Sequence, residues 1–190
     1  TPAGVYTIGY KLCEKLNPTN CKDTTITVTV GAPLIAATND TFTGINGALG
    51  NSNVGSAFGG DTVNGAPAST ANATLAVNTP ASPVPGAPVG APVPVLNPAT
   101  GVVSVPAGTP AGTYTISYKL CDIVNPTNCK DATITVTVDP APIVATPDPY
   151  SVPNGATGSP NAGNVLSNDT VNGITPPTVG PTGNATLAVT

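Results

Sequence analysis

The chain has 190 residues and a formal net charge of −4, with nine acidic residues, five lysines, and neither arginine nor histidine. Because the lysines are not clustered, the charge pattern argues against nucleic-acid binding and against electrostatic attachment to an anionic membrane. Since histidine is absent and Glu14 is the single glutamate, the composition offers almost nothing for acid–base catalysis, so we do not expect an enzyme. No apolar run is long enough to insert into a membrane.

The sequence contains a long internal repeat. Residues 1–30 and residues 109–138 differ at only six of thirty positions, so the repeat has an offset of 108 residues. The hexapeptide GDTVNG at 60–65 returns as NDTVNG at 168–173 at the same offset. Self-similarity at a fixed period of this size predicts tandem domains of about 108 residues each.

The repeat also predicts domain boundaries. We interpret residues 1–30 as the C-terminal part of one domain, residues 31–138 as a complete domain, and residues 139–190 as the N-terminal part of the next domain. A domain of about 108 residues is long enough to bury its own core. The two partial domains lack a counterpart of residues 78–108 and cannot rebuild a full domain. We therefore expect one long covalent chain in which neighbouring repeats are the partners.

Short apolar segments in the first half of the complete domain predict strands. These segments cover residues 34–38, 54–58 and 73–77, and they are separated by residues that favour turns. An aromatic residue at Phe42 is expected to pack in the core. Residues 79–94 contain too many prolines for a central strand and are expected to form a loop or a sheet edge.

The following segment predicts a hairpin. Residues 93–96 and 102–105 are rich in valine, and they flank the turn-forming sequence NPATG at 97–101. Together with the closing hairpin described next, these segments make roughly seven short strands, the number typical of an immunoglobulin-like sandwich. We therefore expect an all-β fold with Greek-key connections.

Residues 113–138 show the clearest strand pattern. Apolar residues alternate with Thr, Ser and Lys in the runs 113–121 and 132–138, and Asn125-Pro126 between the runs suits a type I turn. Alternation with period two places one set of side chains in the core. The residues predicted to lie in the core are Tyr114, Ile116, Tyr118, Leu120, Ile134 and Val136, with Tyr6, Ile8, Tyr10 and Leu12 as their counterparts in the first copy.

Two pairs of cysteines close the turns of these hairpins. Cys121 and Cys129, like Cys13 and Cys21, fall on the outward face by parity and stand at the two ends of one loop. We predict the disulfides Cys13–Cys21 and Cys121–Cys129, which indicate an oxidising, extracytoplasmic compartment. Free thiols and metal binding are the alternatives, although zinc would need four ligands and a redox-active pair is typically C-x-x-C.

The residues of this unit resemble a known type of repeat. The segments VSVPAGTPAGTYTISYKLCD at 103–122, ATITVTV at 132–138 and VLSNDTVNG at 165–173 are similar to immunoglobulin-like or cadherin-like repeats of giant bacterial surface adhesins, especially fibril repeats of Bacteroidetes. The resemblance implies a linear array of β-sandwich domains outside the cell, at the bacterial cell surface. It also implies a filament or stalk that gives reach and multivalent display for cell adhesion to a host surface, an environmental surface or a glycan.

A carbohydrate- or surface-binding module of a secreted protein is the alternative function. Such a module needs a pocket or an exposed cluster of aromatic side chains. The chain has no tryptophan, and the parity of its paired tyrosines points them into the core.

Two aspartates, Asp61 and Asp169, are candidate calcium ligands, and a turn in which the carboxylate binds its own backbone is the alternative. The calcium signatures of cadherins are absent, and the segments between domains carry at most one acid. We therefore do not expect calcium to stiffen these linkers. We expect no other cofactor. The tripeptide Asp-Thr-Val at both positions resembles the O-glycosylation signal of Bacteroidetes, which implies glycans on Thr62 and Thr170.

Overall fold

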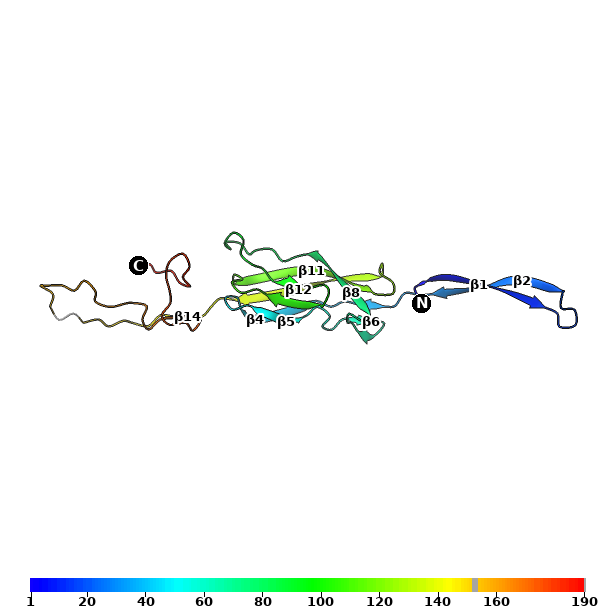
Figure 1. Cartoon of the computed structure of the whole chain (residues 1–190), viewed down its shortest axis with the longest axis horizontal. Coiled ribbons are helices and arrows are strands. Elements are labelled where there is room, and N and C mark those ends of the chain that lie inside the picture. Colours follow the sequence, from blue (N-terminus) through cyan, green and yellow to red (C-terminus); the bar gives the residue numbers. More distant parts are fainter. Residues whose placement is uncertain (152–153, 190) are drawn as a thin grey trace.

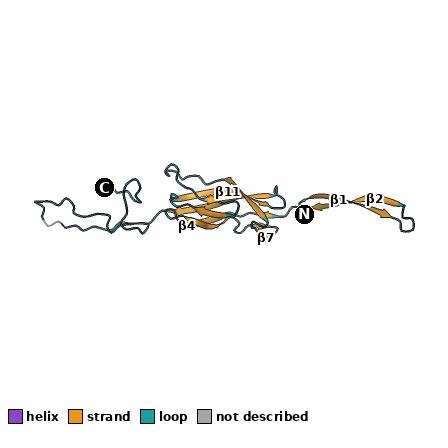
Figure 2. Ribbon diagram, in the orientation of Figure 1, coloured by secondary structure: helices purple, strands orange, loops and turns teal. Residues whose placement is uncertain are grey.

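The computed structural model describes residues 1–151 and 154–189, and within these it contains strands, turns and loops without a helix (Figure 1, Figure 2). The predicted all-β fold class is confirmed, and this part of the chain contains no helix that could cross a membrane. Residues 152, 153 and 190 belong to the predicted segment 139–190 and lie outside the described residues. Three parts follow one another in Figure 1, namely an N-terminal hairpin (residues 4–30), a β-sandwich (residues 31–139) and a C-terminal segment (residues 140–189).

The first sheet of the sandwich has four strands. Their order across the sheet is β4 (Asp40–Asn46), β12 (Cys129–Asp139), β11 (Gly112–Asp122) and β8 (Ala73–Thr79). β12 pairs antiparallel with β11 and parallel with β4. The first long strand of the sandwich therefore lies beside its last strand.

The second sheet has three antiparallel strands. Their order is β5 (Asn51–Ser56), β10 (Val102–Val105) and β9 (Val95–Leu96). A small third sheet follows the order β3 (Ile35–Ala36), β6 (Thr62–Val63) and β7 (Ala66–Pro67). Two packed sheets with these crossing connections form an immunoglobulin-like β-sandwich, as the sequence predicts.

The core lies between the two main sheets and is built by alternation. On β11, the side chains of Tyr114, Ile116, Tyr118 and Leu120 are at most 1% exposed, and the residues between them point the other way. Ile134 and Val136 of β12 are 0% exposed, and Val103 and Val105 of β10 close the core from the second sheet. Each buried side chain of this size contributes about 1.5–3 kcal/mol relative to an exposed one.

The N-terminal hairpin consists of β1 (Gly4–Cys13) and β2 (Cys21–Val30), which pair in the same register as β11 and β12. The prediction that its apolar side chains lie in a core is wrong for this structure. The exposed fractions are 38% for Tyr6, 53% for Ile8, 46% for Tyr10 and 69% for Leu12. Among the described residues, no second sheet packs on this hairpin, so the face that β11 buries stays open on β1.

The C-terminal segment has little regular structure. β13 (Ile143–Val144) pairs with β14 (Thr170–Val171), and this pair corresponds to β3 and β6 at the repeat offset. Residues 148–151, the counterparts of the start of β4, form no strand. β4 is ordered by pairing with β12, and no described strand offers that pairing to the C-terminal segment.

Some strands of the sandwich differ from the sequence prediction. β4 is not predicted because polar residues and Gly44, with φ of +74°, interrupt its alternation. The strand expected at 54–58 lies at 51–56 as β5, and the strand expected at 93–96 is reduced to Val95–Leu96. Residues 79–94 carry no strand beyond Thr79, as their proline content predicts.

Candidate functional site: a disulfide-closed loop at the module junction

Both predicted disulfides are present. Cys121–Cys129 and Cys13–Cys21 each join residues that stand directly opposite in the hairpin register, with Cα atoms 4.1 Å apart. Cys121 is only 9% exposed, although it alternates with the core residue Leu120 along β11. The reason is β8, which extends the sheet beyond β11 and places Thr74 beside Cys121. We call residues 121–129 the disulfide loop.

Hydrogen bonds within the disulfide loop hold its shape. Asp122 is 3% exposed, and its carboxylate accepts bonds of 3.1 Å from the backbone N–H groups of Val124 and Asn125 and a further bond from the Asn125 side chain. The side-chain bond from Asn125 is the main reason that the pKa of Asp122 lies below its usual range. The backbone N–H of Asn128 donates to Asn125 O at 2.8 Å, which closes the predicted turn.

Two asparagines of the disulfide loop also reach outside the sandwich strands. The Nδ2 of Asn128 donates to Pro33 O at 2.7 Å, in the stretch that follows the N-terminal hairpin. The Oδ1 of Asn125 accepts a hydrogen bond from the backbone N–H of Ala3. The loop therefore contacts the chain on both sides of the hairpin, and the disulfide holds it where these contacts are made.

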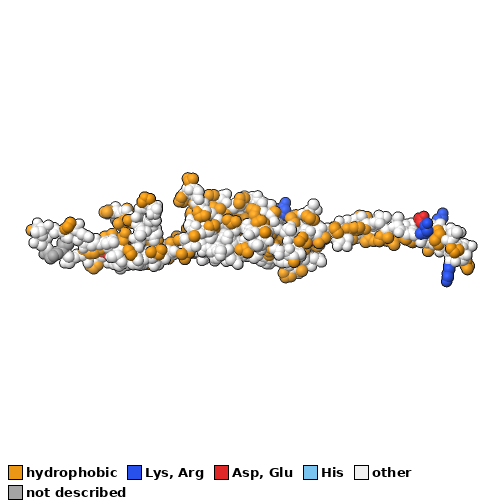
Figure 3. Space-filling model, viewed as in Figure 1, with side chains coloured by type: hydrophobic (Ala, Val, Ile, Leu, Met, Phe, Trp, Pro, Cys, Tyr) orange, Lys and Arg blue, Asp and Glu red, His pale blue; other side chains and the backbone are white. Residues whose placement is uncertain are grey.

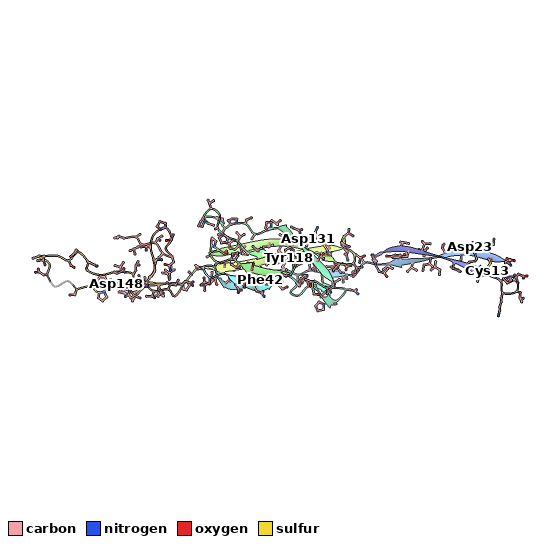
Figure 4. All side chains as sticks on the ribbon, viewed as in Figure 1. Cys13, Asp23, Phe42, Tyr118, Asp131 and Asp148 are labelled. Carbon is pink, nitrogen blue, oxygen red and sulfur yellow. A yellow bond between two sulfur atoms is a disulfide. The ribbon has the colours of Figure 1, made fainter. Side chains whose placement is uncertain are left out.

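The corresponding loop of the N-terminal hairpin makes different contacts. Glu14 stands in the place of Asp122 and accepts bonds from the Nδ2 atoms of Asn17 at 2.7 Å and Asn20 at 2.9 Å. Hydrogen bonding by Asn20, and then by Asn17, lowers the pKa of Glu14. Asn20 is the counterpart of Asn128, so the same position binds a linker carbonyl in one copy and the loop's own carboxylate in the other. Figure 4 places Cys13, where this loop begins, far from the sandwich.

A second set of contacts joins the sandwich to the C-terminal segment. The Nδ2 of Asn46, at the end of β4, donates to the Oδ1 of Asn172 at 2.6 Å. The backbone N–H of Gly47 donates to Asp139 O at 3.1 Å, which fixes the end of β12. Asn172 has a positive φ of 54°, and its counterpart Asn64 has a φ of 52°, so the same turn presents this side chain in both copies.

An acidic pair, the buried Asp61 and the half-buried Asp40, ties the small sheet to the core. Asp61 is 2% exposed, and its Oδ1 accepts bonds of 2.7 Å from the N–H and 3.1 Å from the hydroxyl of Thr38. The Tyr118 hydroxyl, inside the sandwich in Figure 4, lies 3.1 Å from Asp61 Oδ2, 3.3 Å from Asp40 Oδ2 and 3.0 Å from Ala57 O. Burial and the neighbouring charge of Asp61 raise the pKa of Asp40 to about 6.

The other predicted site residues lie in the small sheets. Asp169, the counterpart of Asp61, accepts a bond of 2.7 Å from the backbone N–H of Thr146. Both carboxylates thus bind the backbone N–H of a threonine two residues after a short strand, β3 or β13, rather than the backbone of their own turn. The described residues contain no group of three or more acidic or sulfur side chains placed to hold a metal ion. Thr62 and Thr170 are half-buried on β6 and β14.

Sequence reasoning missed the junction asparagines. Asn125 and Asn128 belong to the sequence NPTN, which both copies share, and that identity was the available signal. Asn46 and Asn172 carry no such signal, because their contact joins residues 126 positions apart.

Comparison with known proteins gives structural likenesses only. No protein family and no curated protein matches the chain. The chain is similar to the human desmocollin-1 ectodomain, with 14% identity, a TM-score of 0.40, and coverage of 67% of this chain and 24% of that chain. It is also similar to the protocadherin gammaB7 EC3-6 cis-dimer structure, with 15% identity, a TM-score of 0.39, and coverage of 78% of this chain and 36% of that one.

A third similar structure is that of protocadherin gamma B2 extracellular cadherin domains 3–6, with 10% identity and a TM-score of 0.38, covering 70% of this chain and 33% of that chain. The chain therefore spans 24% to 36% of the length of these three chains. At this similarity, the assignment of the fold rests on the strand order described above.

Proposed function

We propose that this chain is a structural repeat module of a long extracellular bacterial surface filament or adhesin stalk, which gives reach and multivalent display for cell adhesion. The observation that carries the proposal is the sandwich flanked by two further copies of parts of itself, with hydrogen bonds to each of them. The proposal assigns the chain no catalytic role and no cofactor, in line with its lack of histidine and arginine.

The contacts at the two junctions support a repeated interface. At the first junction, Ala3, directly before the N-terminal hairpin, binds Asn125 of the sandwich, and at the second, Asn46 of the sandwich binds Asn172. Asn64 of the sandwich is the counterpart of Asn172 and has the same backbone conformation. Every module of a tandem array would therefore carry both partners of each contact, and the domains would be 1–30, 31–138 and 139–190, as the repeat predicts.

The disulfides support the extracellular location. Two disulfides close the loops at the ends of the two long hairpins, and such bonds persist in oxidising compartments. Neighbouring repeats of the same chain are the partners that the proposal names, with a host surface, an environmental surface or a glycan as the target of adhesion. Thr62 and Thr170 remain predicted sites of O-glycosylation, and the intact mass of the native protein would reveal glycans.

Small-angle X-ray scattering of proteins with one, two and three tandem copies of residues 31–138 tests the proposed rod. We expect the maximum dimension to grow in proportion to the number of copies. A compact particle with three copies would contradict the stalk. Adhesion of bacteria that display shortened arrays should then fall as modules are removed, which tests the adhesive role separately.

The alternative function as a carbohydrate-binding module would need an aromatic platform. Tyr6 and Tyr10 are exposed on one face of the N-terminal hairpin, but their counterparts Tyr114 and Tyr118 are core residues. Because the same side chains in the same register pack into a protein core in the sandwich, they do not support a carbohydrate-binding platform. We therefore favour the function as a stalk module over that of a carbohydrate-binding module.

A further inference from the structure

The strand β8 forms a free edge of the sandwich. It stands last in the sheet order β4, β12, β11 and β8, so it pairs with β11 on one side and with no described strand on the other. Residues 73–77 keep one unbroken register with β11, and the register shifts only after Val77. A flat edge of this kind presents backbone N–H and C=O groups that can pair with another strand.

Alternation along β8 decides which of its backbone groups bind β11. Asn72 O accepts a hydrogen bond of 3.1 Å from the N–H of Ile123, which directly follows β11. Hydrogen-bonded and non-hydrogen-bonded pairs alternate in an antiparallel ladder, so Thr74 and Ala76 also direct their backbone groups toward β11. The residues between them direct their backbone groups away from the sheet.

These outward groups belong to Ala73, Leu75 and Val77. The N–H of Ala73 donates to Ser69 O at 2.9 Å, which satisfies it within the chain. No other backbone group of the described residues binds the remaining outward groups of these three residues. The edge thus offers the N–H groups of Leu75 and Val77, together with the outward C=O groups, to a partner strand.

Residues 73–77 carry none of the features that protect a sheet edge from pairing. The whole of β8, ATLAVNT, contains no charged residue and no proline. The opposite edge of the same sheet differs, because β4 contains Asp40 and its register with β12 shifts between Phe42 and Ile45. Figure 3 shows few charged side chains over the visible face of the sandwich. Since charges, prolines and register shifts are what block edge pairing, β8 is open to it.

An apolar groove lies beside this edge. Its volume is about 320 Å³, and it is lined by β8 and by residues of the loops around it: Phe58, Thr70, Ala73, Thr74, Leu75, Pro98 and Ala99. Further along the strand, Val77 is 36% exposed, although its parity places it on the same face as the core residue Leu75. A strand added to this edge would direct every second side chain toward the side on which the groove lies.

We propose that β8 of a second copy of this chain adds antiparallel to this edge, so that the two four-stranded sheets become one continuous sheet across two chains. Leu75 stands opposite Leu75 of the other copy, and Ala73 stands opposite Val77. The N–H of Leu75 then donates to the C=O of Leu75 across the joint, and the N–H of Val77 donates to the C=O of Ala73. The N–H of Ala73, which Ser69 already satisfies, is not needed.

The side chains of β8 fit a second copy as the occupant. A strand without charge meets its own copy without repulsion. The half-exposed Val77 of each copy comes opposite Ala73 of the other, on the face where the groove lies, so each copy supplies an apolar side chain to the groove of its partner. On the other face, Thr74 stands beside Ala76, and these small side chains permit the close approach of a non-hydrogen-bonded pair. The contact is isologous and closes as a two-fold dimer.

The joint is small, and it recurs with the repeat. It is confined to residues 73–77 of each copy, so we expect reversible association at ~0.1–1 mM. The hexapeptide NATLAV at 72–77 returns at 184–189, so tandem modules would present the same edge again and bind more tightly through multivalency. The proposal rests on the sandwich alone and holds whether or not the chain serves as an adhesin stalk.

Amide hydrogen exchange of the unaltered protein tests which groups form the joint, and it needs no variant. Between ~20 µM and ~1 mM protein, the exchange of the Leu75 and Val77 amides should slow by roughly two- to fivefold, as the dimer forms. The amides of Thr74 and Ala76 are the internal control, because they bind β11 at both concentrations. Exchange that is independent of concentration at Leu75 and Val77, or that slows equally at all four residues, would overturn the proposal.

Cross-linking tests the register of the joint. Thr74 of one copy should stand opposite Ala76 of the other as a non-hydrogen-bonded pair, the kind of pair that the native disulfide Cys121–Cys129 joins with Cα atoms 4.1 Å apart. We expect a disulfide-linked dimer on oxidation of a mixture of the Thr74→Cys and Ala76→Cys proteins. A mixture of Thr115→Cys with Ala76→Cys is the matched control, because the exposed Thr115 lies on an interior strand. Equal cross-linking in both mixtures, or none in either, would contradict the proposed register.

Sedimentation equilibrium tests the association itself. Thr74→Glu/Ala76→Glu should weaken self-association by roughly tenfold or more, because it sets like charges directly opposite each other across the joint. Thr113→Glu/Thr115→Glu adds the same charge at exposed positions of β11 and should leave the association unchanged. An unaltered chain that stays monomeric up to ~1 mM, or two variants with the same effect, would count against the joint. The scattering test of the tandem rod measures the length of a single array and does not depend on this contact, so the two proposals fail separately.

Discussion

Tyr118 links the packed core to the acidic pair of Asp61 and Asp40. Its side chain is 0% exposed, and its hydroxyl lies within hydrogen-bond distance of both Asp61 and Asp40. Tyr118 binds Oδ2 of Asp61 and Thr38 binds Oδ1, so both carboxylate oxygens have a hydrogen-bond partner. Asp61 is only 2% exposed, and these partners replace the water that it lacks. These bonds attach the small sheet of β3, β6 and β7 to the two main sheets.

Removal of this hydroxyl should destabilise the sandwich. We expect Tyr118→Phe to lower the free energy of unfolding by ~1–3 kcal/mol, because a buried carboxylate loses a partner. Urea unfolding monitored by circular dichroism measures the change. Tyr10→Phe is the matched control, since Tyr10 holds the corresponding position in the N-terminal hairpin and is 46% exposed. If both variants lost the same stability, the buried bond would not be the cause.

Asp40 should make the sandwich more stable in mild acid. Its pKa is raised to about 6 by burial and by the charge of Asp61, above a value of about 3.9 in the unfolded chain. Between these values the folded state binds more protons, so the free energy of unfolding falls as the pH rises from about 4 through about 6 and then levels off. The stability that Asp40 contributes is thus fully present below the pKa of Asp40 in the unfolded chain.

Comparison of the unaltered protein with Asp40→Asn isolates this group from carboxylates with lowered pKa values, such as Asp122, which act in the opposite sense. We expect the urea midpoint of Asp40→Asn, relative to that of the unaltered protein, to rise between pH 4 and pH 7, because only the unaltered protein loses the contribution of Asp40 over this range. A difference that does not vary with pH would show that Asp40 is not responsible.

Among the elements, the closing hairpin of β11 and β12 is the one most fully predicted from sequence. Its alternation, its turn at Asn125 and its disulfide follow from local pattern, because a strand of period two and a tight turn are set by neighbouring residues. β4 is different, since its order comes from the parallel pairing with β12, far along the chain. The exposure of β1 could not be predicted from the sequence either, because the burial of a strand depends on whether a second sheet packs against it and not on the strand alone.

The two disulfides should differ in their effect on stability. The double variant Cys121→Ser/Cys129→Ser is expected to destabilise the sandwich by ~2.5 kcal/mol, the loop entropy of a short ring. Cys13→Ser/Cys21→Ser should leave the unfolding midpoint of the sandwich unchanged, because residues 13–20 are all exposed and belong to no part of the core. Calorimetry of both variants measures the difference. Equal losses would mean that the hairpin and the sandwich unfold as one unit.

The loop asparagines should govern the junction more than the core. We expect Asn125→Ala/Asn128→Ala to release Ala3 and Pro33, and to broaden the distribution of orientations between the N-terminal hairpin and the sandwich. Distances between spin labels on Thr7 and on an exposed residue of the sandwich would report this. Asn17→Ala/Asn20→Ala is the control in the other loop, and it should leave those distances as they are.

At the scale of the whole molecule, the repeat in the sequence predicts modules of one kind but not how they meet. The junction contacts join residues up to 126 positions apart and depend on side chains at loop ends, whose positions no periodicity gives. Asn46 lies in β4, a strand that is itself not predicted. The candidate site could therefore be predicted as far as its disulfide, and the asparagine contacts required the three-dimensional structure.

The parallel pairing of β4 with β12 has a mechanical consequence. β4 is the first long strand of the sandwich and β12 is its last, and they are joined over Ile134–Asp139 and Asp40–Asn46. When the two ends of the chain are pulled apart, tension runs along both strands in opposite directions. The hydrogen bonds between them are then loaded in shear and must rupture together, whereas a pair pulled from one end would unzip bond by bond. The sandwich is thereby suited to resist stretching forces, which act on its rate of unfolding.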